Sequence, residues 1–447
     1  MATVLSDNDF RGVWNAEVAI VPIGAVVRVG KIRYTTLRLE HHKMTGSSPL
    51  TVLCIASYEK GHEFLRECKR QGCTVLLLTS ESLMSTANWP RKSVDEVFYM
   101  PDVNKKWNLQ HTILAVSHLA QTRRIDRIVP LDDFDLETAA ALREHLRIPG
   151  MGETTTRYFR DKLAMRSRAK FAGLPVPEFV RLINDREVHE FVRQTPSPWM
   201  LKPRSQAGAI GLKKIASEQD LWMALEALGD QRTFYLLERY VPGEIFHVDT
   251  VVFHRELLFC NVSRYGTPPM DVTHEGGVFT TRTLPSETLQ SRELCELNWK
   301  VLEAFELVWG VSHSEFIVAQ NGTAFFLETS ARVGGANIAE LVEAATGVNL
   351  WREWAKVEIA GEVGSYSAPR AAQHAAGLLI SLAKQEWPNT DEFADPEIVW
   401  RMKKAWHVGM ILKSPNPARI EELLTQYSER VRNMYTAVQP PPDRPTH

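Results

Sequence analysis

Two glutamates on neighbouring strand-like segments give the sequence its clearest chemical signal. Glu315 lies in the apolar run 311–318 and Glu328 ends the run 323–328, and the Gln-Asn-Gly turn at 320–322 is typical of a β-hairpin. Two adjacent carboxylates repel each other unless a cation joins them, and Mg²⁺ prefers oxygen ligands together with nucleotide phosphates. The hairpin therefore predicts a magnesium site. A salt-bridged pair of strands is the competing interpretation.

A lysine followed by a loop with two glycines forms a second chemical window. Lys202 ends an apolar strand-like run, and Gly208 and Gly211 lie in the loop that follows. Glycines let backbone N–H groups approach a polyphosphate closely while a lysine neutralises its charge. The GxxxxGK[ST] pattern is absent, so this is not a P-loop. A solvated surface hairpin is the alternative.

A third window, residues 234–244, is an apolar strand that ends in a Pro-Gly turn. The backbone groups of such an exit suit the edge of an adenine, and Glu244 just past the turn could accept from ribose hydroxyls. An ordinary strand with a polar exit is the simpler interpretation. Arg332, shortly after Glu328, offers a planar fork for a carboxylate or a phosphoryl group.

The elements that must position these residues change in character along the chain. Residues 50–56, 61–71 and 74–79 have the spacing of a strand, a helix and a strand, a βαβ signature, and the acidic turn 132–135 precedes an expected helix at 136–146. No GxGxxG follows the first strand, so a dinucleotide site is not expected there. Beyond the Gly- and Pro-rich segment that ends near residue 177, strand-like runs with intervening helices indicate an α+β region, and an amphipathic helix is expected at 417–432.

Composition restricts the class of protein. At 447 residues the chain exceeds the size of a single core, so we expect two or three subdomains. The 52 basic and 54 acidic residues nearly cancel, which gives no reason to expect a nucleic acid or a membrane surface as a partner. No apolar run or signal pattern suggests export, and the five cysteines without CxxC spacing favour buried thiols in a reducing compartment over disulfides or zinc. We therefore expect a cytoplasmic protein.

From about residue 50 to about residue 435, the order of these windows resembles the ATP-grasp superfamily, particularly its carboxylate–amine ligases and biotin-carboxylase-like members. The resemblance implies a fold of the α/β and α+β classes, an ATP-grasp fold with an N-terminal doubly wound (pre-ATP-grasp) subdomain. The expected parts are an N-terminal extension outside the core (1–48), the N-terminal α/β subdomain (49–150), the nucleotide-binding region (151–365) with its lid (about 175–245), and a C-terminal subdomain and tail (366–447).

The resemblance also assigns the nucleotide site, residue by residue. Lys162, in a Phe-Arg-Asp-Lys sequence, is similar to the family's first nucleotide lysine and Lys202 to the second, and Glu244 is similar to the ribose acid. The implied cofactor is ATP. The adenine hinge would consist of Glu238, Arg239, Tyr240 and Val241.

On the metal side, Glu315 and Glu328 resemble the metal-bridging acids, and Arg332 resembles the arginine that steadies the reacting phosphoryl group or the substrate carboxylate. The third metal position, usually an asparagine, is Ser330, whose hydroxyl is a shorter and poorer ligand than an amide oxygen. The implied ion is Mg²⁺, with Mn²⁺ as an alternative. The predicted catalytic residues are Arg332 and Lys202.

The implied enzyme is an ADP-forming C–N ligase, with amino-acid ligation as one form. A small-molecule carboxylate attacks the γ-phosphate of ATP, and an amine or similar nucleophile opens the resulting acyl phosphate. Two alternatives stay open: a catalytically idle ATP-binding sensor or partner subunit, for which Ser330 speaks, and a bicarbonate-activating enzyme. His274 and His313 could act in acid–base chemistry, although a lone histidine is more often structural. The sequence identifies neither the substrates, expected to contact the loop 263–283, nor the oligomeric state.

Overall fold

The computed structural model describes residues 49–208, 210–266 and 277–437. The predicted extension 1–48, His274 and part of the predicted substrate loop lie outside the described residues.

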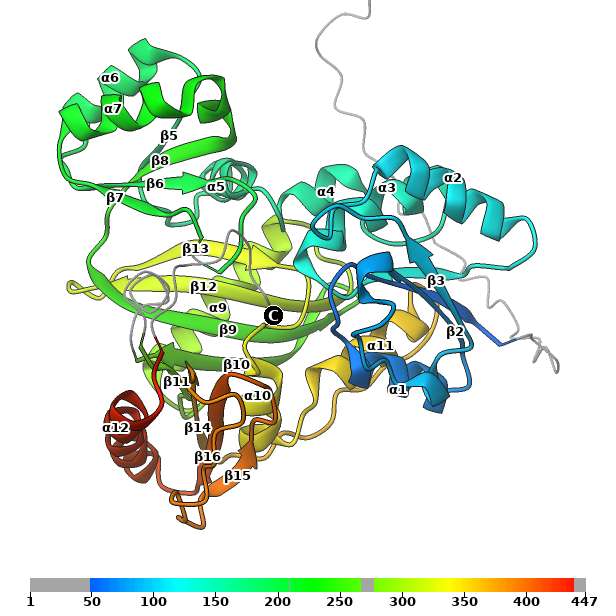
Figure 1. Ribbon diagram of the computed structural model, residues 1–447. Helices are drawn as coiled ribbons and strands as arrows, with labels where there is room; N and C mark the ends of the chain where they lie inside the picture. Colours follow the sequence, from blue (N-terminus) through cyan, green and yellow to red (C-terminus); the bar gives the residue numbers. More distant parts are fainter. Residues whose placement is uncertain (1–48, 209, 267–276, 438–447) are drawn as a thin grey trace, which may run out of the picture. The chain divides into compact units, whose positions relative to one another are not determined.

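The N-terminal part is a parallel sheet in the order β3-β2-β1-β4, covered by helices on both faces (Figure 1). Alternate residues of β1 enter two separate cores: Val52 and Cys54 pack with one, Leu53 and Ile55 with the other. Burial on both faces explains why the strand is continuously apolar. The predicted βαβ arrangement and the helix at 136–146 are confirmed. The elements are β1 (Thr51–Ala56), α1 (His62–Arg70), β2 (Thr74–Ser80), β3 (Glu96–Met100), α2 (Leu109–Ala120), β4 (Arg127–Pro130), the 3-10 turn η3 (Asp133–Asp135) and α3 (Leu136–Leu146).

A small antiparallel sheet in the order β5-β8-β6-β7 lies in the predicted lid, and α6 and α7 cover one of its faces (Figure 1). We keep the name lid for this sheet and its two helices. Leu201 and Leu237 of its strands pack against Leu221 and Leu225 of α7, so the lid has a core of its own. The elements from the N-terminal sheet through the lid are α4 (Glu153–Arg157), α5 (Lys162–Phe171), β5 (Phe179–Arg181), α6 (Asp185–Gln194), β6 (Trp199–Pro203), β7 (Lys213–Ile215), α7 (Glu218–Leu228) and β8 (Tyr235–Arg239).

The largest element is an eight-stranded antiparallel sheet in the order β13-β12-β9-β10-β11-β14-β16-β15. It continues from the predicted nucleotide-binding region into the predicted C-terminal region, since β14, β15 and β16 belong to it. Its strands are β9 (Gly243–Phe253), β10 (Glu256–Tyr265), β11 (Phe279–Thr283), β12 (Gly310–Ala319), β13 (Ala324–Ser330), β14 (Ala375–Leu382), β15 (Ile398–Arg401) and β16 (His407–Ser414). Its helices are α9 (Leu289–Ala304), α10 (Ile338–Thr346), α11 (Leu350–Ala360) and α12 (Pro417–Met434).

Helix α12 confirms the amphipathic helix predicted at 417–432. The side chain of Asn416 accepts from the Ala418 N–H, and Pro417 occupies the first helical position, where its missing N–H costs nothing.

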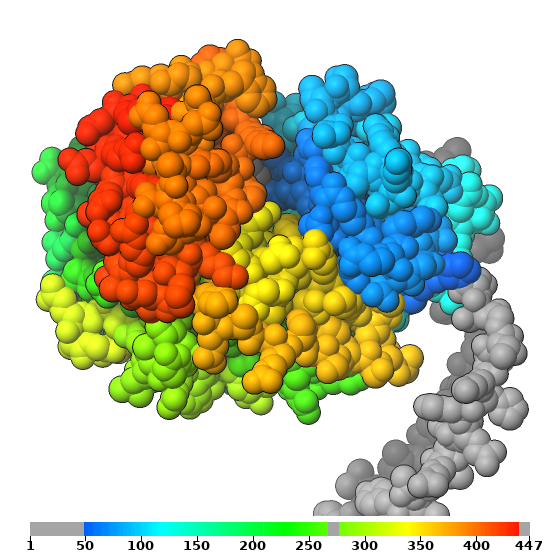
Figure 2. All heavy atoms as spheres, turned by 90° about the horizontal axis from the view of Figure 1, so that it is seen from below, coloured from blue at the N-terminus to red at the C-terminus, as the bar shows by residue number. Residues whose placement is uncertain are grey.

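Seen from below, the yellow segment that contains α11 lies between the blue N-terminal part and the red C-terminal helix (Figure 2). Helix α11 packs directly against α1, which joins the N-terminal sheet to the rest of the molecule.

The cysteines correct one sequence expectation. Cys260 of β10 and Cys295 of α9 form a disulfide, so the prediction of thiols alone was wrong for this pair. The two cysteines are 35 residues apart, and no local pattern in the sequence indicates that they pair. The packing of α9 on β10 brings them together. Cys54, Cys68 and Cys73 are free and buried, as predicted. Within the described ranges, the helices are too short or too polar to cross a bilayer.

Candidate functional site

A cavity of about 350 Å³ lies among the lid, the eight-stranded sheet and the turn after β4. Eleven of the thirteen predicted site residues line it: Lys162, Lys202, Gly208, Glu238, Arg239, Tyr240, Val241, Glu315, Glu328, Ser330 and Arg332. Segments far apart in the sequence therefore meet at one hollow, which is where a ligand site is expected.

The other two predicted residues do not line this cavity. The Glu244 side chain is more than half exposed, and its Oε1 lies 3.0 Å from Nη2 of Arg264 on β10. Gly211 has a φ of 73°, and a Cβ there would meet the Pro203 ring at 2.9 Å. Gly211 is therefore needed for the path of the lid loop. A ligand role for either residue stays a prediction.

Lys202 on β6 and Glu238 on β8 are diagonal neighbours on paired strands, since Lys202 lies opposite Leu236. Both are buried. The Lys202 ammonium contacts Oε1 of Glu238, while Arg166 of α5 places Nε and Nη2 each 3.0 Å from Oε2. Burial alone would raise the pKa of Glu238, but the charges of Arg166 and Lys202 hold the pKa below its usual value. The Glu238 carboxylate thus stays ionised and forms an ion pair with Lys202, which lines the cavity.

The predicted adenine hinge already uses part of its backbone. The N–H of Arg239 donates to the Glu178 carbonyl at 2.8 Å, and the N–H of Tyr240 donates to the Pro198 carbonyl at 3.1 Å. An adenine edge would therefore have to meet other backbone groups of the segment.

The predicted hairpin is confirmed: Glu315 on β12 and Glu328 on β13 are direct cross-strand partners. Nζ of Lys162 lies 2.5 Å from Oε2 of Glu328, and the same ammonium donates to the Gln206 carbonyl of the lid loop at 2.7 Å. The Tyr265 hydroxyl donates to Oε1 of Glu315 at 2.8 Å. Two carboxylates on one side of a hairpin offer the oxygen donors that Mg²⁺ requires, so these residues fit the predicted ion.

Next to this pair the two strands shift register. Glu315 pairs with Glu328, whereas Phe316 pairs with Phe326, so Leu327 has no direct partner on β12. The bulge lets the Leu327 carbonyl leave the ladder and accept from Nη1 of Arg166.

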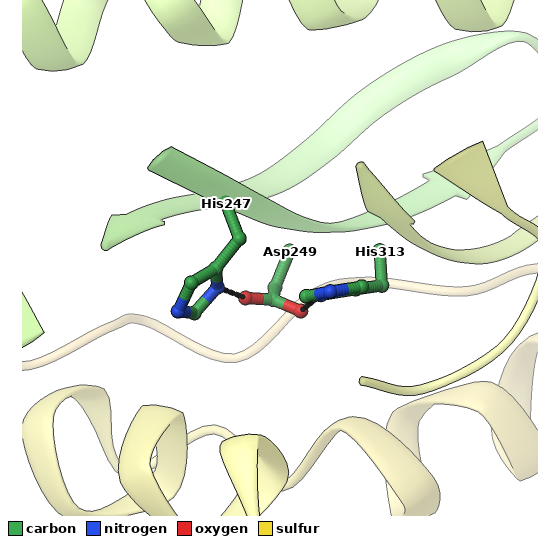
Figure 3. A group of neighbouring side chains, drawn as sticks. All are labelled: His247, Asp249 and His313. Atoms are coloured by element: carbon green, nitrogen blue, oxygen red, sulfur yellow. Dashed lines mark hydrogen bonds and ion pairs between the residues drawn. The ribbon is translucent and has the colours of Figure 1, made fainter. Parts of the chain in front are cut away.

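Three polar side chains, those of His247, Asp249 and His313, lie in a row (Figure 3), and Glu315 is the cross-strand partner of His247. The rings of His247 and His313 point at the Asp249 carboxylate from either side, with Nδ1 to oxygen distances of 2.8 Å and 2.9 Å. Nε2 of His313 lies 3.8 Å from Oε1 of Glu315. Burial would lower the pKa of His313, but the adjacent Asp249 carboxylate outweighs it and raises the pKa to about 9.

Sequence reasoning missed His247 and Asp249, although two signals could have found them. They alternate on β9, so they share a face, and the strand pairing places them opposite Glu315 and His313. Their donor atoms and that of His313 lie within 4.8 Å of one another, close enough to hold a cation.

Arg332 and Ser330 both contact Asp133, a residue of the acidic turn before α3 that the sequence analysis did not assign to the site. The Ser330 hydroxyl donates to Oδ1 of Asp133, and Nε of Arg332 lies 3.8 Å from the same oxygen. Nη1 of Arg160 lies 3.0 Å from Oδ2. Asp133 follows β4, at the carboxyl edge of a parallel sheet where ligands commonly bind, and that position was the available signal.

A larger cavity of about 490 Å³ is lined by Arg143, Trp309 and Glu358, among others. The indole N–H groups of Trp309 and Trp354 donate to the Glu358 carboxylate at 3.1 Å and 3.0 Å. The Glu358 carboxylate in this cavity therefore already has hydrogen-bond partners within the protein. None of the predicted site residues lines it. We therefore place the candidate site in the smaller cavity, where the lysines and acids converge.

Residues 159–336 match the family model of the ATP-grasp domain. This part of the chain is therefore an ATP-grasp domain. An L-arginine-specific L-amino acid ligase of Bacillus subtilis is 24% identical over 294 residues, which cover 62% of this chain and 70% of that protein. A D-alanine–D-alanine ligase of Dechloromonas aromatica is 24% identical over 194 residues, covering 42% and 63% of the two chains.

Solved structures confirm the ATP-grasp fold predicted from the sequence. The L-amino acid ligase from Bacillus licheniformis has a TM-score of 0.69 at 16% identity, covering 88% of this chain and 99% of that one. The N5-carboxyaminoimidazole synthetase from Staphylococcus aureus, complexed with ADP, has a TM-score of 0.65 at 16% identity, covering 84% and 96%. The matched ATP-grasp domain begins just before Lys162 and ends just after Arg332, so it contains every predicted site residue.

Proposed function

We propose that this protein is an ADP-forming ligase that uses ATP and Mg²⁺ to activate a small carboxylate and join it to an amine. The observation that carries the proposal is the convergence of Lys162, Lys202, the Glu315–Glu328 pair and Arg332 on one cavity. Phosphoryl transfer requires mainly positioning and charge stabilisation, and these residue types supply both.

Each residue has a distinct proposed task. Lys162 and Lys202 neutralise phosphate charge from two sides, with Glu328 and Glu238 holding their ammonium groups. Glu315 and Glu328 would hold Mg²⁺, which would supply charge neutralisation at the phosphates. Arg332 binds the substrate carboxylate and then the acyl phosphate, because its planar fork matches both groups. The same oxygen donors would accept Mn²⁺.

The substrate class that we propose is an amino acid for both partners. The supporting observation is the similarity to an L-arginine-specific L-amino acid ligase and to D-alanine–D-alanine ligases. The cavity is mixed in character, with apolar side chains such as Ile317 and Ile338 beside the charged groups. A cytoplasmic location would supply ATP, Mg²⁺ and free amino acids together, and it stays a prediction.

The test is ATP-dependent ADP and phosphate release by the purified protein with pairs of L-amino acids, combined with mass spectrometry of the ligated product. We expect both products to require the two amino acids and Mg²⁺. ADP release that depends on bicarbonate would support the carboxylase-like alternative. ATP binding without turnover on any amino acid or small carboxylate would support the idle sensor and refute the ligase.

A further inference from the structure

Asp133 joins the N-terminal sheet to the phosphoryl side of the candidate site. It begins η3, directly after β4, while its three polar neighbours come from other elements: Arg160, which precedes α5, Ser330 at the end of β13, and Arg332 just beyond it. The carboxylate is only 9% exposed. A buried carboxylate that spans parts of the chain about two hundred residues apart has a specific structural task.

The charged groups that act on the Asp133 carboxylate are mainly cations. Burial would raise its pKa, but Arg160, Arg332, the Ser330 hydroxyl and Lys162 together hold the pKa below its usual value, so the carboxylate is ionised. The Asp133 carboxylate therefore has several cations around it, and the Nε atoms of Arg160 and Arg332 are buried without a hydrogen-bond partner among the described residues. Buried donors of this kind are costly unless a ligand satisfies them.

Without Asp133, two guanidinium groups at this wall would repel each other and lose their common acceptor. Nη1 of Arg332 also donates to its neighbouring Val333 carbonyl at 2.8 Å, which fixes one end of the fork but not its direction toward the cavity. The carboxylate fixes that direction, because it is the anion nearest Nε.

We propose that Asp133 is a positioning residue for the ligation reaction: it holds Arg332, Arg160 and Ser330 so that the turn after β4 completes the phosphoryl-binding side of the site. The inference rests on the proposed function and deepens it. Asp133 acts through Arg332 and does not itself touch the reacting atoms. The N-terminal subdomain thereby contributes to chemistry that the matched ATP-grasp domain alone would leave incomplete.

The test compares Asp133→Asn with Asp135→Asn. Asp135 lies in the same turn and is also buried, but it accepts from the Ser57 N–H at 2.9 Å and does not line the cavity. We expect Asp133→Asn to lower kcat by roughly 30-fold or more while the KM for ATP changes less than about 3-fold, and Asp135→Asn to keep kcat within about 3-fold. Equal kcat losses in the two variants, or a rise in KM alone, would overturn the proposal.

A second pair of variants keeps the test decisive if Asp133→Asn does not fold. Ser330→Ala removes the hydroxyl that donates to Asp133, whereas Ser314→Ala removes a buried hydroxyl of the same hairpin that bonds Thr329 at 2.7 Å instead. Ser330→Ala should lower kcat several-fold and Ser314→Ala should not. Where both variants fold, Asp133→Asn combined with Arg332→Lys should lose less activity than the product of the single losses, because both residues act as one unit. Independent losses contradict the proposal.

A binding measurement separates failure of this inference from failure of the proposed function. Orthovanadate resembles a transferring phosphoryl group, so calorimetry of the MgADP complex with orthovanadate needs no carboxylate substrate. The proposal requires Asp133→Asn to weaken orthovanadate binding about 10-fold or more, with MgADP affinity and Asp135→Asn close to wild type. Wild type that binds orthovanadate without ligating amino acids would refute the ligase alone, whereas unchanged binding in Asp133→Asn would refute the positioning role alone.

Discussion

Replacing Lys202 with alanine should remove tight ATP binding and leave the fold intact. The Lys202 side chain is 11% exposed at the cavity wall and contacts Glu238. Arg166 holds the same carboxylate through two 3.0 Å contacts, so Glu238 keeps a buried partner when the lysine is removed. Since Lys202 adds little to the apolar core of the lid, we expect a melting temperature close to that of the wild type.

The magnitude follows from the charge that is lost. A hydrogen bond to a charged group contributes about 1.5–3 kcal/mol, which corresponds to roughly 10- to 150-fold in Kd. The Coulomb attraction of two unit charges at 4 Å is about 4 kcal/mol at an effective dielectric constant of about 20, which sets an upper bound. Glu238 would then face the phosphates with one counter-charge fewer, so the loss should lie near the upper end of that range.

The assay is calorimetric titration of ATP and of ADP with and without Mg²⁺, accompanied by thermal unfolding. Lys213→Ala is the matched control, because Lys213 lies opposite Leu201 on the paired strand β7 with its side chain exposed. We expect the control to bind as wild type does. Wild-type affinity in Lys202→Ala would show that the lysine does not meet phosphate, and the placement of the nucleotide would be wrong.

Three further outcomes are expected. Glu328→Gln should abolish Mg²⁺-dependent turnover while ATP still binds, because the hinge lies on a separate strand; full turnover would make the two acids a structural pair. Stability should fall by about 3 kcal/mol between about pH 6.5 and pH 9, because His313 has a folded-state pKa of about 9 and its stabilisation is complete only below the unfolded-state pKa of about 6.5. Denaturant titrations should find this slope flattened in His313→Gln, and an unchanged slope would exclude His313 as its source. Cys295→Ser should lower the free energy of unfolding by about 3–4 kcal/mol, from the loop that the bond to Cys260 closes, and the same protein under reductant should match it.

The sequence predicted those parts of the site that depend on residues close together in the chain. The Glu315–Glu328 hairpin follows from two alternating strands and the turn between them, and Lys202 follows from the end of an apolar strand. Glu244 shows the limit of that reasoning. On β9 its side chain alternates with that of Ile245, and Ile245 is the one that lines the cavity. The strand could be found, but not which of its faces would be turned inward.

The groups that the sequence did not predict act over long separations. Asp249 meets His313 at a separation of 64 residues, and Asp133 meets Ser330 at a separation of 197. The first contact depends on the pairing of β9 with β12, and the second depends on how the turn after β4 packs beside the end of β13. Neither arrangement has a local signature in the sequence. The disulfide is similar, since nothing in the spacing of its two cysteines requires β10 and α9 to lie together.

The β-bulge at Leu327 allows Arg166 to bind two strands at once. Because the Leu327 carbonyl leaves the ladder, Arg166 binds the strand that carries Glu328 and, with the same guanidinium, binds Glu238 beside Lys202. A displacement of the strand that carries Glu328 is therefore passed to Lys202 through one planar group. Under the proposed roles of Glu328 and Lys202, binding of the ion and binding of the nucleotide are thermodynamically linked. Reciprocity then requires that the factor by which the ion tightens nucleotide binding equals the factor by which the nucleotide tightens ion binding.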